Sequence, residues 1–346
     1  MSRILQTGTS RASQPDSEAR AQANAGPSFA IIIEWDNARL SELGRARQML
    51  KALQEQVINY RPQPAQPPQI VILYDKSRID PKIIHQTLDE MIDATAWQAV
   101  VKLVPTDGLN YYELKNFGVP QTDREIILFI DSDTIPEAGW LDALMSSIEQ
   151  PHIDVVGGNT YVAPDNFVAR AFSLFWFFEV RSKGAALRPY NFFYANNVAF
   201  KRSVLERYPY PDMESFRGQC HVMSEQMRRD GIIIYRHDGA RMMHPPTNGI
   251  GHFLRRAICE GHDEVTIHRA NNMGRLLTGP FGSLSRLARK FNSMIGGAVR
   301  HRRDIGLSVL GAVAAVGLGT VYCVLKFFGE VVTYYNPTFV RRHWPI

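Results

Sequence analysis

The chain has 346 residues, of which 45% are hydrophobic and 21% charged, with a formal net charge of +5. This length accommodates one large domain with attachments. The mild charge, without helix-turn-helix, zinc-finger or aromatic-basic patterns, argues against nucleic-acid binding. Three scattered cysteines give neither a disulfide framework nor a CxxC metal site, which favours a reducing compartment; they are Cys220, Cys259 and Cys323.

The chain opens with a polar segment, residues 1–27, that is rich in small residues and lacks the apolar core of a signal peptide. Its composition predicts a disordered leader. Four short apolar runs follow, each leading into a helical pattern. Strands that alternate with helices predict an α/β fold of Rossmann-like type, with a mostly parallel sheet flanked by helices. The runs are Phe29–Ile33, Ile70–Tyr74, Ala99–Val104 and Ile126–Ile130.

Apolar residues at helical spacing mark the helices between and after these runs. For the helix after the fourth run, Pro136 suits the first turn. The three apolar faces are Leu43, Leu50, Leu53 and Val57; Ile84, Leu88 and Met91; and Leu141, Leu144, Met145 and Ile148.

Near the end of the chain, Ile305–Leu325 contains no charged residue. At about 1.5 Å per helical residue it matches the ~30 Å thickness of bilayer hydrocarbon. We therefore predict a C-terminal transmembrane helix over residues 305–328 and a short tail over 329–346. A buried helix of a soluble core is the alternative.

A basic segment, residues 271–304, precedes this span and is predicted to be amphipathic and juxtamembrane. Its Arg300, Arg302 and Arg303 favour a single-pass protein whose main domain, residues 28–270, faces the cytoplasm. Basic residues beyond the span weaken this orientation. Within the span, the small residues Gly311, Ala315 and Gly319 recur every four positions, a spacing that permits a homodimer contact.

Two carboxylates, Asp131 and Asp133, stand one residue apart where an apolar run meets a polar turn. In a parallel sheet, ligands bind beyond the carboxyl ends of the strands, and residues i and i+2 of an extended chain face the same side. Both carboxylates can therefore face one ligand. Divalent cations such as Mg²⁺ or Mn²⁺ take oxygen ligands, and a diphosphate binds such a cation. We predict a divalent-metal site here, although a turn or a helix N-cap uses the same residues.

Further motifs surround this pair in a characteristic order. The first strand leads into "EWDNARL", the second reads "VILYDKS", and "LNYYELKNFGV" precedes the strand that ends at Asp131. "FIDSDTIPEAGWLDAL", "VVGGNTYV", "YANNVAFKRSVLER" and "GARMMHPP" follow. In this order the motifs resemble glycosyltransferase family 2, whose members have the GT-A fold, over roughly residues 29–262.

The resemblance implies a nucleotide-diphosphate-sugar donor and a divalent metal, Mg²⁺ or Mn²⁺, held by Asp131, Asp133 and His244. It also implies an inverting transfer of the sugar to a saccharide or lipid-linked acceptor at the membrane. The residues implied to contact the nucleotide-sugar are Glu34, Asp36, Asn37, Asp75, Asn116, Asp131, Asn196 and Asn197.

One position departs from the family pattern. The resemblance implies an acidic pair at the start of the helix "QCHVMSEQMRRDG", but Gln219 and Cys220 stand there. An amide is no proton acceptor, and an ordinary thiol titrates too high. We favour the adjacent His221 as the catalytic base. Otherwise the acceptor is already anionic, or the protein is a degenerate member that binds nucleotide-sugar or glycan without turnover.

Overall fold

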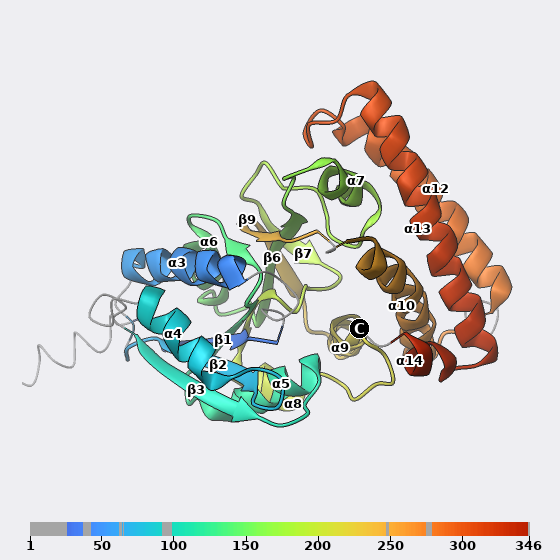
Figure 1. Cartoon of the computed structure of the whole chain (residues 1–346). Helices are drawn as coiled ribbons and strands as arrows, with labels where there is room; N and C mark the ends of the chain where they lie inside the picture. Colours follow the sequence, from blue (N-terminus) through green and yellow to red (C-terminus); the bar gives the residue numbers. More distant parts are fainter. Residues whose placement is uncertain are drawn as a thin grey trace, which may run out of the picture.

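The computed structural model describes residues 26–36, 43–61, 64, 66–91, 99–246, 249–274 and 279–344. Most of the predicted leader, residues 1–25, and also Asn37 lie outside this part, so the predictions made for them stay predictions. Figure 1 shows a central sheet with helices on both faces and a further group of helices formed by the C-terminal part of the chain.

Within the described part of the chain, nine strands form one sheet in the order β3-β2-β1-β4-β8-β6-β9-β5, and β7 also pairs with β9. Pairing is parallel from β3 to β4 and between β6 and β9, and antiparallel in the remaining pairs, so the sheet is mixed. The strands are β1 (Phe29–Glu34), β2 (Gln69–Asp75), β3 (Val100–Thr106), β4 (Ile126–Asp131), β5 (Ile135–Pro136), β6 (Val155–Val162), β7 (Leu187–Tyr190), β8 (Asn197–Lys201) and β9 (Ile234–His244).

The four predicted apolar runs are confirmed as strands β1 to β4, which form the parallel half of the sheet. Every residue of β1 and β4 is buried, as expected of strands covered on both faces. Alternate residues of β1 enter different hydrophobic clusters: Ile31 and Ile33 pack on one face of the sheet and Ile32 on the other.

Helices cover both faces of the sheet (Figure 1). The helices α3 (Leu43–Asn59), α4 (Pro81–Met91) and α6 (Trp140–Ile148) pack on the first face. The second face is covered by α5 (Tyr111–Gly118), η1 (Val119–Gln121), α8 (Arg202–Arg207) and α9 (Gln219–Arg229).

The predicted start of α6 is wrong. Pro136 does not lie in the first helical turn but in the short strand β5, where it pairs with Met242 of β9. The helix begins at Trp140, after Gly139 in a left-handed conformation with φ of +80°. Ile135 and Pro136 pair with strand β9, so they are extended and not helical. The spacing of neighbouring residues does not encode this pairing, because β9 is distant in the sequence.

The remaining helices form a layer beside the sheet domain. They are α7 (Phe167–Phe175), α10 (Gly249–Ala270), α12 (Pro280–His301), α13 (Val309–Tyr335) and α14 (Phe339–His343). In Figure 1, α12 and α13 run side by side along the outer edge, with α10 between them and the sheet domain. Phe172, Phe175, Phe253 and Tyr322 join α7, α10 and α13 in one aromatic cluster.

The long helix α13 is, within the described part of the chain, the helix that is long and apolar enough to cross a membrane. It begins at Val309 and continues to Tyr335, past the predicted end of the span at residue 328, so the predicted tail begins inside the helix. The basic segment 271–304 contains α12. The division of the chain into domains stays a prediction, because α12 and α13 pack against α7 and α10 of the main domain.

The contact between α10 and α13 is close and partly ionic. The Lys326 ammonium lies 2.9 Å from Glu260 and 3.0 Å from Glu264. A Cβ atom added to Gly261 would lie 2.0 Å from the Lys326 carbonyl oxygen, and one added to Gly329 would lie 2.2 Å from the Ile258 carbonyl oxygen. One glycine on each helix, Gly261 on α10 and Gly329 on α13, therefore allows the two backbones to come into direct contact.

Two of the three residues of the predicted homodimer contact, Gly311, Ala315 and Gly319, are covered within the chain. Ala315 is buried, and a Cβ on Gly319 would lie 2.2 Å from Met294 Sδ and 2.6 Å from Phe175. Gly319 therefore allows α12 and α7 to approach α13, and the homodimer stays a prediction.

We expect Gly329→Ala to lower the free energy of unfolding by about 1–3 kcal/mol, because the added methyl group overlaps backbone that cannot move away cheaply. Gly317→Ala on the same helix is the matched control, since a Cβ there meets nothing within 4 Å. It should be neutral or stabilising by up to about 1 kcal/mol. Unfolding of the detergent-solubilised chain, followed by circular dichroism, measures both. Equal effects of the two substitutions would contradict the close contact.

Candidate active site

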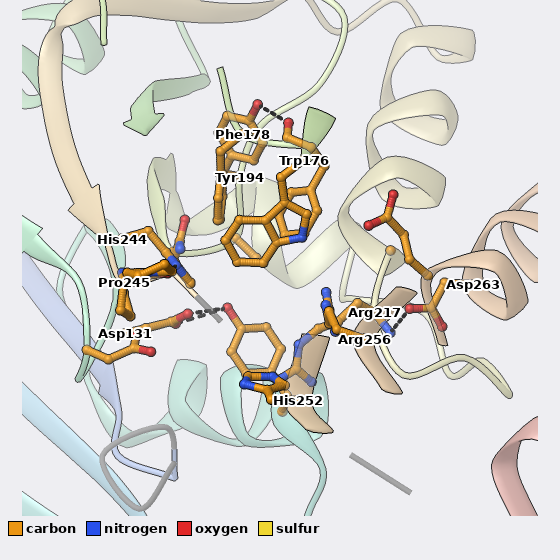
Figure 2. A pocket seen from close by; sticks show the side chains of 18 of the residues that line it. Asp131, Trp176, Phe178, Tyr194, Arg217, His244, Pro245, His252, Arg256 and Asp263 are labelled. Carbon is orange, nitrogen blue, oxygen red and sulfur yellow. Dashed lines mark hydrogen bonds between the residues drawn. The ribbon is translucent and has the colours of Figure 1, made fainter. Parts of the chain in front are cut away.

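A cavity of about 750 Å³ opens at the carboxyl ends of β4 and β9. Its wall includes Asp131 and Asp133 after β4, His244 at the end of β9, and side chains from α9 and α10. Figure 2 shows Asp131 and His244 on one side of the cavity, Arg217 and Arg256 across from them, and Trp176 between. The sheet edge predicted from the sequence is therefore the floor of the cavity.

Asp131 is held by two side chains of α5. The Tyr111 hydroxyl donates to its carboxylate at 2.8 and 2.9 Å, the contact dashed in Figure 2, and the Lys115 ammonium lies 2.8 Å from Oδ1. Tyr111 and Lys115 are four residues apart and so lie on one face of the helix. Lys115 is fully buried, so this ion pair is shielded from water.

Asp133 is buried too, but its surroundings differ. Its Oδ1 has no hydrogen-bond partner among the described residues. Burial, followed by the charge of Asp131, raises the pKa of Asp133 to about 7. The positive charge of Arg45 opposes this rise in pKa, but the Arg45 Nε donates at 2.7 Å to the backbone oxygen of Asp133 and not to its carboxylate. An electron pair of Asp133 thus remains available to a ligand in the cavity.

His244 presents one ring nitrogen to the cavity. Its Nδ1 lies 2.7 Å from the Pro245 carbonyl oxygen, which makes Nδ1 the donor and leaves Nε2 as an acceptor. Burial lowers the pKa of His244 to about 3, so the imidazole is neutral at pH 7. The ring packs against Trp176 and Phe178. A neutral imidazole fixed by a backbone carbonyl is the form that binds metals.

These residues fit a divalent cation in part. The described residues contain no group of three His, Cys, Asp or Glu side chains close enough to hold a metal by themselves. The predicted set of Asp131, Asp133 and His244 is therefore not assembled as a cage. Mg²⁺ commonly binds to one or two carboxylates and completes its shell with substrate phosphates and water. The unpartnered Asp133 oxygen fits that kind of site.

The start of α9 lines the cavity without a usable carboxylate, as the sequence indicated. Gln219 and Cys220 are buried there, and burial raises the pKa of the Cys220 thiol, which lies 3.6 Å from the Tyr112 hydroxyl. His221 also lines the cavity and packs on Phe192. Burial lowers the pKa of His221, so it is neutral at pH 7 and able to accept a proton.

Sequence reasoning missed the carboxylates that α10 contributes, among them Asp263. Its oxygens accept the backbone N–H groups of Phe216, at 2.7 Å, and Arg217, at 3.1 Å, just before α9. Burial raises the pKa of Asp263 to about 7. A carboxylate from α10 thus lies beside the N-terminal end of α9, where the family pattern has acids. No local motif marks it, because the contact joins separate parts of the chain.

The three aromatic residues directly after α7, Trp176, Phe177 and Phe178, line the cavity. Trp176 is buried, yet it lines the cavity, and its Nε1 has no partner among the described residues. Arg217 stacks 4.1 Å from the Tyr111 ring centre, and Arg256 lies 5.5 Å from the Phe177 ring centre. Aromatic surfaces and cations therefore face the same space.

Asn196 lines the cavity and accepts a hydrogen bond from Thr160. The adjacent Asn197 does not reach the cavity: it accepts from Trp140 Nε1 at 2.8 Å and donates to the Ala240 carbonyl at 3.1 Å. These hydrogen bonds join β8 to α6 and β9, and the predicted contact of Asn197 with the sugar stays a prediction.

Four other predicted nucleotide-contacting residues also lie outside the cavity wall. Asp75 accepts from Ser77 and from the Gly108 N–H, and Asn116 exchanges two hydrogen bonds with the Tyr210 backbone. Asp36 pairs with Arg78 at 3.2 Å. Glu34 is fully buried in register with Asp131, and burial raises its pKa well above the usual range. Nucleotide contact by these four stays a prediction.

Residues 42–209 match the model of glycosyl transferase family 2. The chain carries a family 2 glycosyltransferase domain. It is 25% identical over 194 residues to glycosyltransferase AglE of Haloferax volcanii, a match that covers 54% of each protein, so the chain spans about half the length of that relative.

The fold is confirmed as GT-A-like by a solved structure. Mannosyltransferase PcManGT from Pyrobaculum calidifontis, determined in complex with GDP-Man and Mn²⁺, superposes with a TM-score of 0.56 over 93% of both chains. The identity is 14%, so the likeness concerns the fold. It covers the C-terminal helices as well as the sheet domain.

We expect Lys115→Met to lower the free energy of unfolding by about 3–5 kcal/mol, because it leaves Asp131 buried without its counter-charge. Lys102→Met is the matched control, since Lys102 is exposed and holds only surface hydrogen bonds to Gln121. Thermal unfolding of both variants tests this. The double substitution Lys115→Met, Asp131→Asn should recover part of the loss; no recovery would contradict the ion pair as the cause.

Proposed function

We propose that the protein is a metal-dependent, inverting glycosyltransferase that moves a sugar from a nucleotide-diphosphate donor to a saccharide or lipid-linked acceptor. The observation that carries the proposal is the buried Asp133 oxygen that lacks a partner among the described residues, beside a second carboxylate on the cavity floor. Two adjacent buried carboxylates are stabilised by a cation, and a diphosphate donor brings such a cation with it.

Asp133 would be the principal metal ligand, because Asp131 already accepts from Tyr111 and Lys115. His244 would add its Nε2, either directly or through water. A bound Mg²⁺ or Mn²⁺ would offset the negative charge that grows on the leaving diphosphate. The Mn²⁺ and GDP-Man in the Pyrobaculum structure support this assignment.

The other residues of the cavity would position the two substrates. Trp176 Nε1 and Asn196 offer polar groups to sugar hydroxyls, and the aromatic wall offers a surface on which a sugar ring can pack. Arg217 and Arg256 add positive charge opposite the carboxylates, suited to a phosphate group. Inversion requires one base and no enzyme nucleophile, and the neutral His221 is our candidate for that base.

Asp133→Asn should abolish turnover, because the amide is a poor ligand for a hard cation. The assay is the release of nucleoside diphosphate by the purified full chain with Mn²⁺ and a panel of UDP- and GDP-sugars. Asp165→Asn, an exposed carboxylate on the rim of the same cavity, is the matched control and should retain activity. Unchanged turnover in Asp133→Asn would refute the metal site.

His221→Ala should lower the turnover of a neutral acceptor by about 10²–10⁴-fold while leaving donor affinity unchanged, as expected for loss of a general base. Turnover is measured for a neutral acceptor and for an acceptor phosphate, in the variant and in the parent protein. Because the phosphate is already anionic and needs no base, a loss confined to the neutral acceptor reports on proton removal. A turnover of the neutral acceptor within threefold of the parent protein would exclude His221 and direct attention to Asp263.

The alternative is a degenerate protein that binds nucleotide-sugar or glycan without turnover. It is favoured by Gln219 and Cys220, which replace the acids of the family pattern. Donor binding measured by thermal shift, without nucleotide release in the presence of any acceptor, would support this alternative.

Action at a membrane is part of the proposal and is supported by the length and apolar composition of α13. The sequence predicts a single pass with the catalytic domain on the cytoplasmic side, and that orientation stays a prediction. The packing of α13 along the catalytic domain instead favours a helix that lies on the membrane.

A further inference from the structure

Both α12 and α13 expose an apolar stripe. On α12 the exposed apolar residues recur at intervals of three and four, so they lie on one face of the helix. The same spacing recurs on α13. The stripe of α12 consists of Phe281, Leu284, Ala288, Phe291, Ile295 and Val299. That of α13 consists of Leu310, Val313, Gly317, Val321, Val324 and Phe328.

The exposure of these residues is far above that of an ordinary core. Phe281 and Leu310 are 80% and 83% exposed, and Val299 is 73% exposed. The two helices are neighbours on the outer edge of the molecule (Figure 1). Large apolar side chains gathered on adjacent helices mark a surface that is covered by something other than water.

The charge around this surface identifies what covers it. Between Val265 and Arg303 the sequence contains no aspartate or glutamate, whereas lysine and arginine are frequent. Arg289 and Arg300 are exposed on α12 next to its apolar stripe, and Arg303 is exposed at the turn into α13. An apolar face bordered by arginines complements a bilayer with anionic headgroups, because the stripe enters the acyl region while the guanidinium groups reach the phosphates.

Both ends of α13 are tied to the same folded domain. Before the helix, Arg170 of α7 donates to the Gly306 carbonyl at 2.9 Å, and Lys183 pairs with Asp304 at 2.8 Å. At the far end, His262 of α10 lies 3.1 Å from the Thr333 hydroxyl, and Arg269 donates to the Tyr334 carbonyl at 3.1 Å.

A helix that crosses a bilayer has its two ends on opposite sides. With both ends of α13 attached to the domain, crossing would draw α7 and α10 into the hydrocarbon as well. The ionic contacts beside α13, such as Lys326 with Glu260 and Arg286 with Glu330, would then lie at membrane depth. That burial is costly for charged groups. A helix that lies in the interface avoids this cost and still covers its apolar stripe.

We propose that α12 and α13 together form a membrane-binding surface that lies in the interface of an anionic bilayer, with α13 parallel to the membrane and not across it. The surface consists of the two apolar stripes and the flanking Arg289, Arg300 and Arg303. This inference does not depend on sugar transfer. It places the whole catalytic domain on one side of the membrane, held against the surface from which a lipid-linked acceptor would come.

The first experiment is flotation of the full chain with vesicles of phosphatidylcholine, alone or mixed with phosphatidylglycerol. Binding should be stronger to the anionic vesicles and should weaken with salt. The triple variant Phe281→Ser, Leu284→Ser, Val299→Ser should reduce binding at least tenfold, since each side chain contributes buried apolar area. The matched control, Ile83→Ser, Val100→Ser, Ile233→Ser, removes exposed apolar side chains from the sheet domain and should bind as the parent does.

The second experiment distinguishes lying from crossing. Arg303→Cys and Arg342→Cys place single exposed thiols before and after α13, and the native cysteines are buried. In sealed membrane vesicles from expressing cells, a membrane-impermeant maleimide should label both positions from the same side. Circular dichroism of each variant confirms folding.

Three results would overturn the proposal. The first is protection of one of the two thiols until the vesicles are opened, which is the signature of a crossing helix. The second is unchanged binding in the α12 triple variant. The third is failure of the full chain to float with vesicles of any lipid composition. None of these depends on nucleotide release, so failure of the membrane proposal is distinct from failure of the glycosyltransferase proposal.

Discussion

The structure depends on the burial of carboxylates at the end of β4. Asp131 lies beside Glu34 in register and close to Asp133, so three acids share a small region that water does not screen. The buried Lys115 pairs with Asp131 and offsets part of this repulsion, and burial raises the pKa of Glu34 well above its usual range. Asp133 keeps one carboxylate oxygen without a hydrogen-bond partner among the described residues, and the proposed binding of a cation with a diphosphate rests on that oxygen.

A second set of charges connects the catalytic domain to its C-terminal helices. Lys326 joins α13 to two acids of α10, and reciprocal glycines bring the two backbones into contact. The same two acids, Glu260 and Glu264, also line the cavity, together with Arg256 and Asp263 of α10. One helix thus links the substrate cavity to the surface that we propose binds the membrane. This arrangement would suit the proposed transfer of a sugar to an acceptor held in a bilayer.

Several elements were predictable because their signals are local. Strands β1, β2 and β4 are apolar runs buried on both faces, β3 is a partly exposed edge strand, and the helices between the strands show regular spacing. Asp131 and Asp133 were found because the end of a parallel strand is where ligands bind. Asn197 and Asp75 were selected by motif position as well; their side chains accept hydrogen bonds from Trp140 and Ser77, respectively, and their predicted ligand contacts stay predictions. Motif position alone does not say which way a side chain turns.

The sequence by itself determined the strand and helix types, the identity of the acids at the sheet edge, the absence of an acid at the start of α9, and the apolar character of α13. Tertiary structure alone decided that Trp176 lines the cavity, that Asp263 reaches the backbone just before α9, and that Gly319 packs against α7 and α12. Periodicity and composition are properties of neighbouring residues, and the chain carries them before it folds. Pairing between distant side chains exists only after packing has brought them together, so no local pattern contains it.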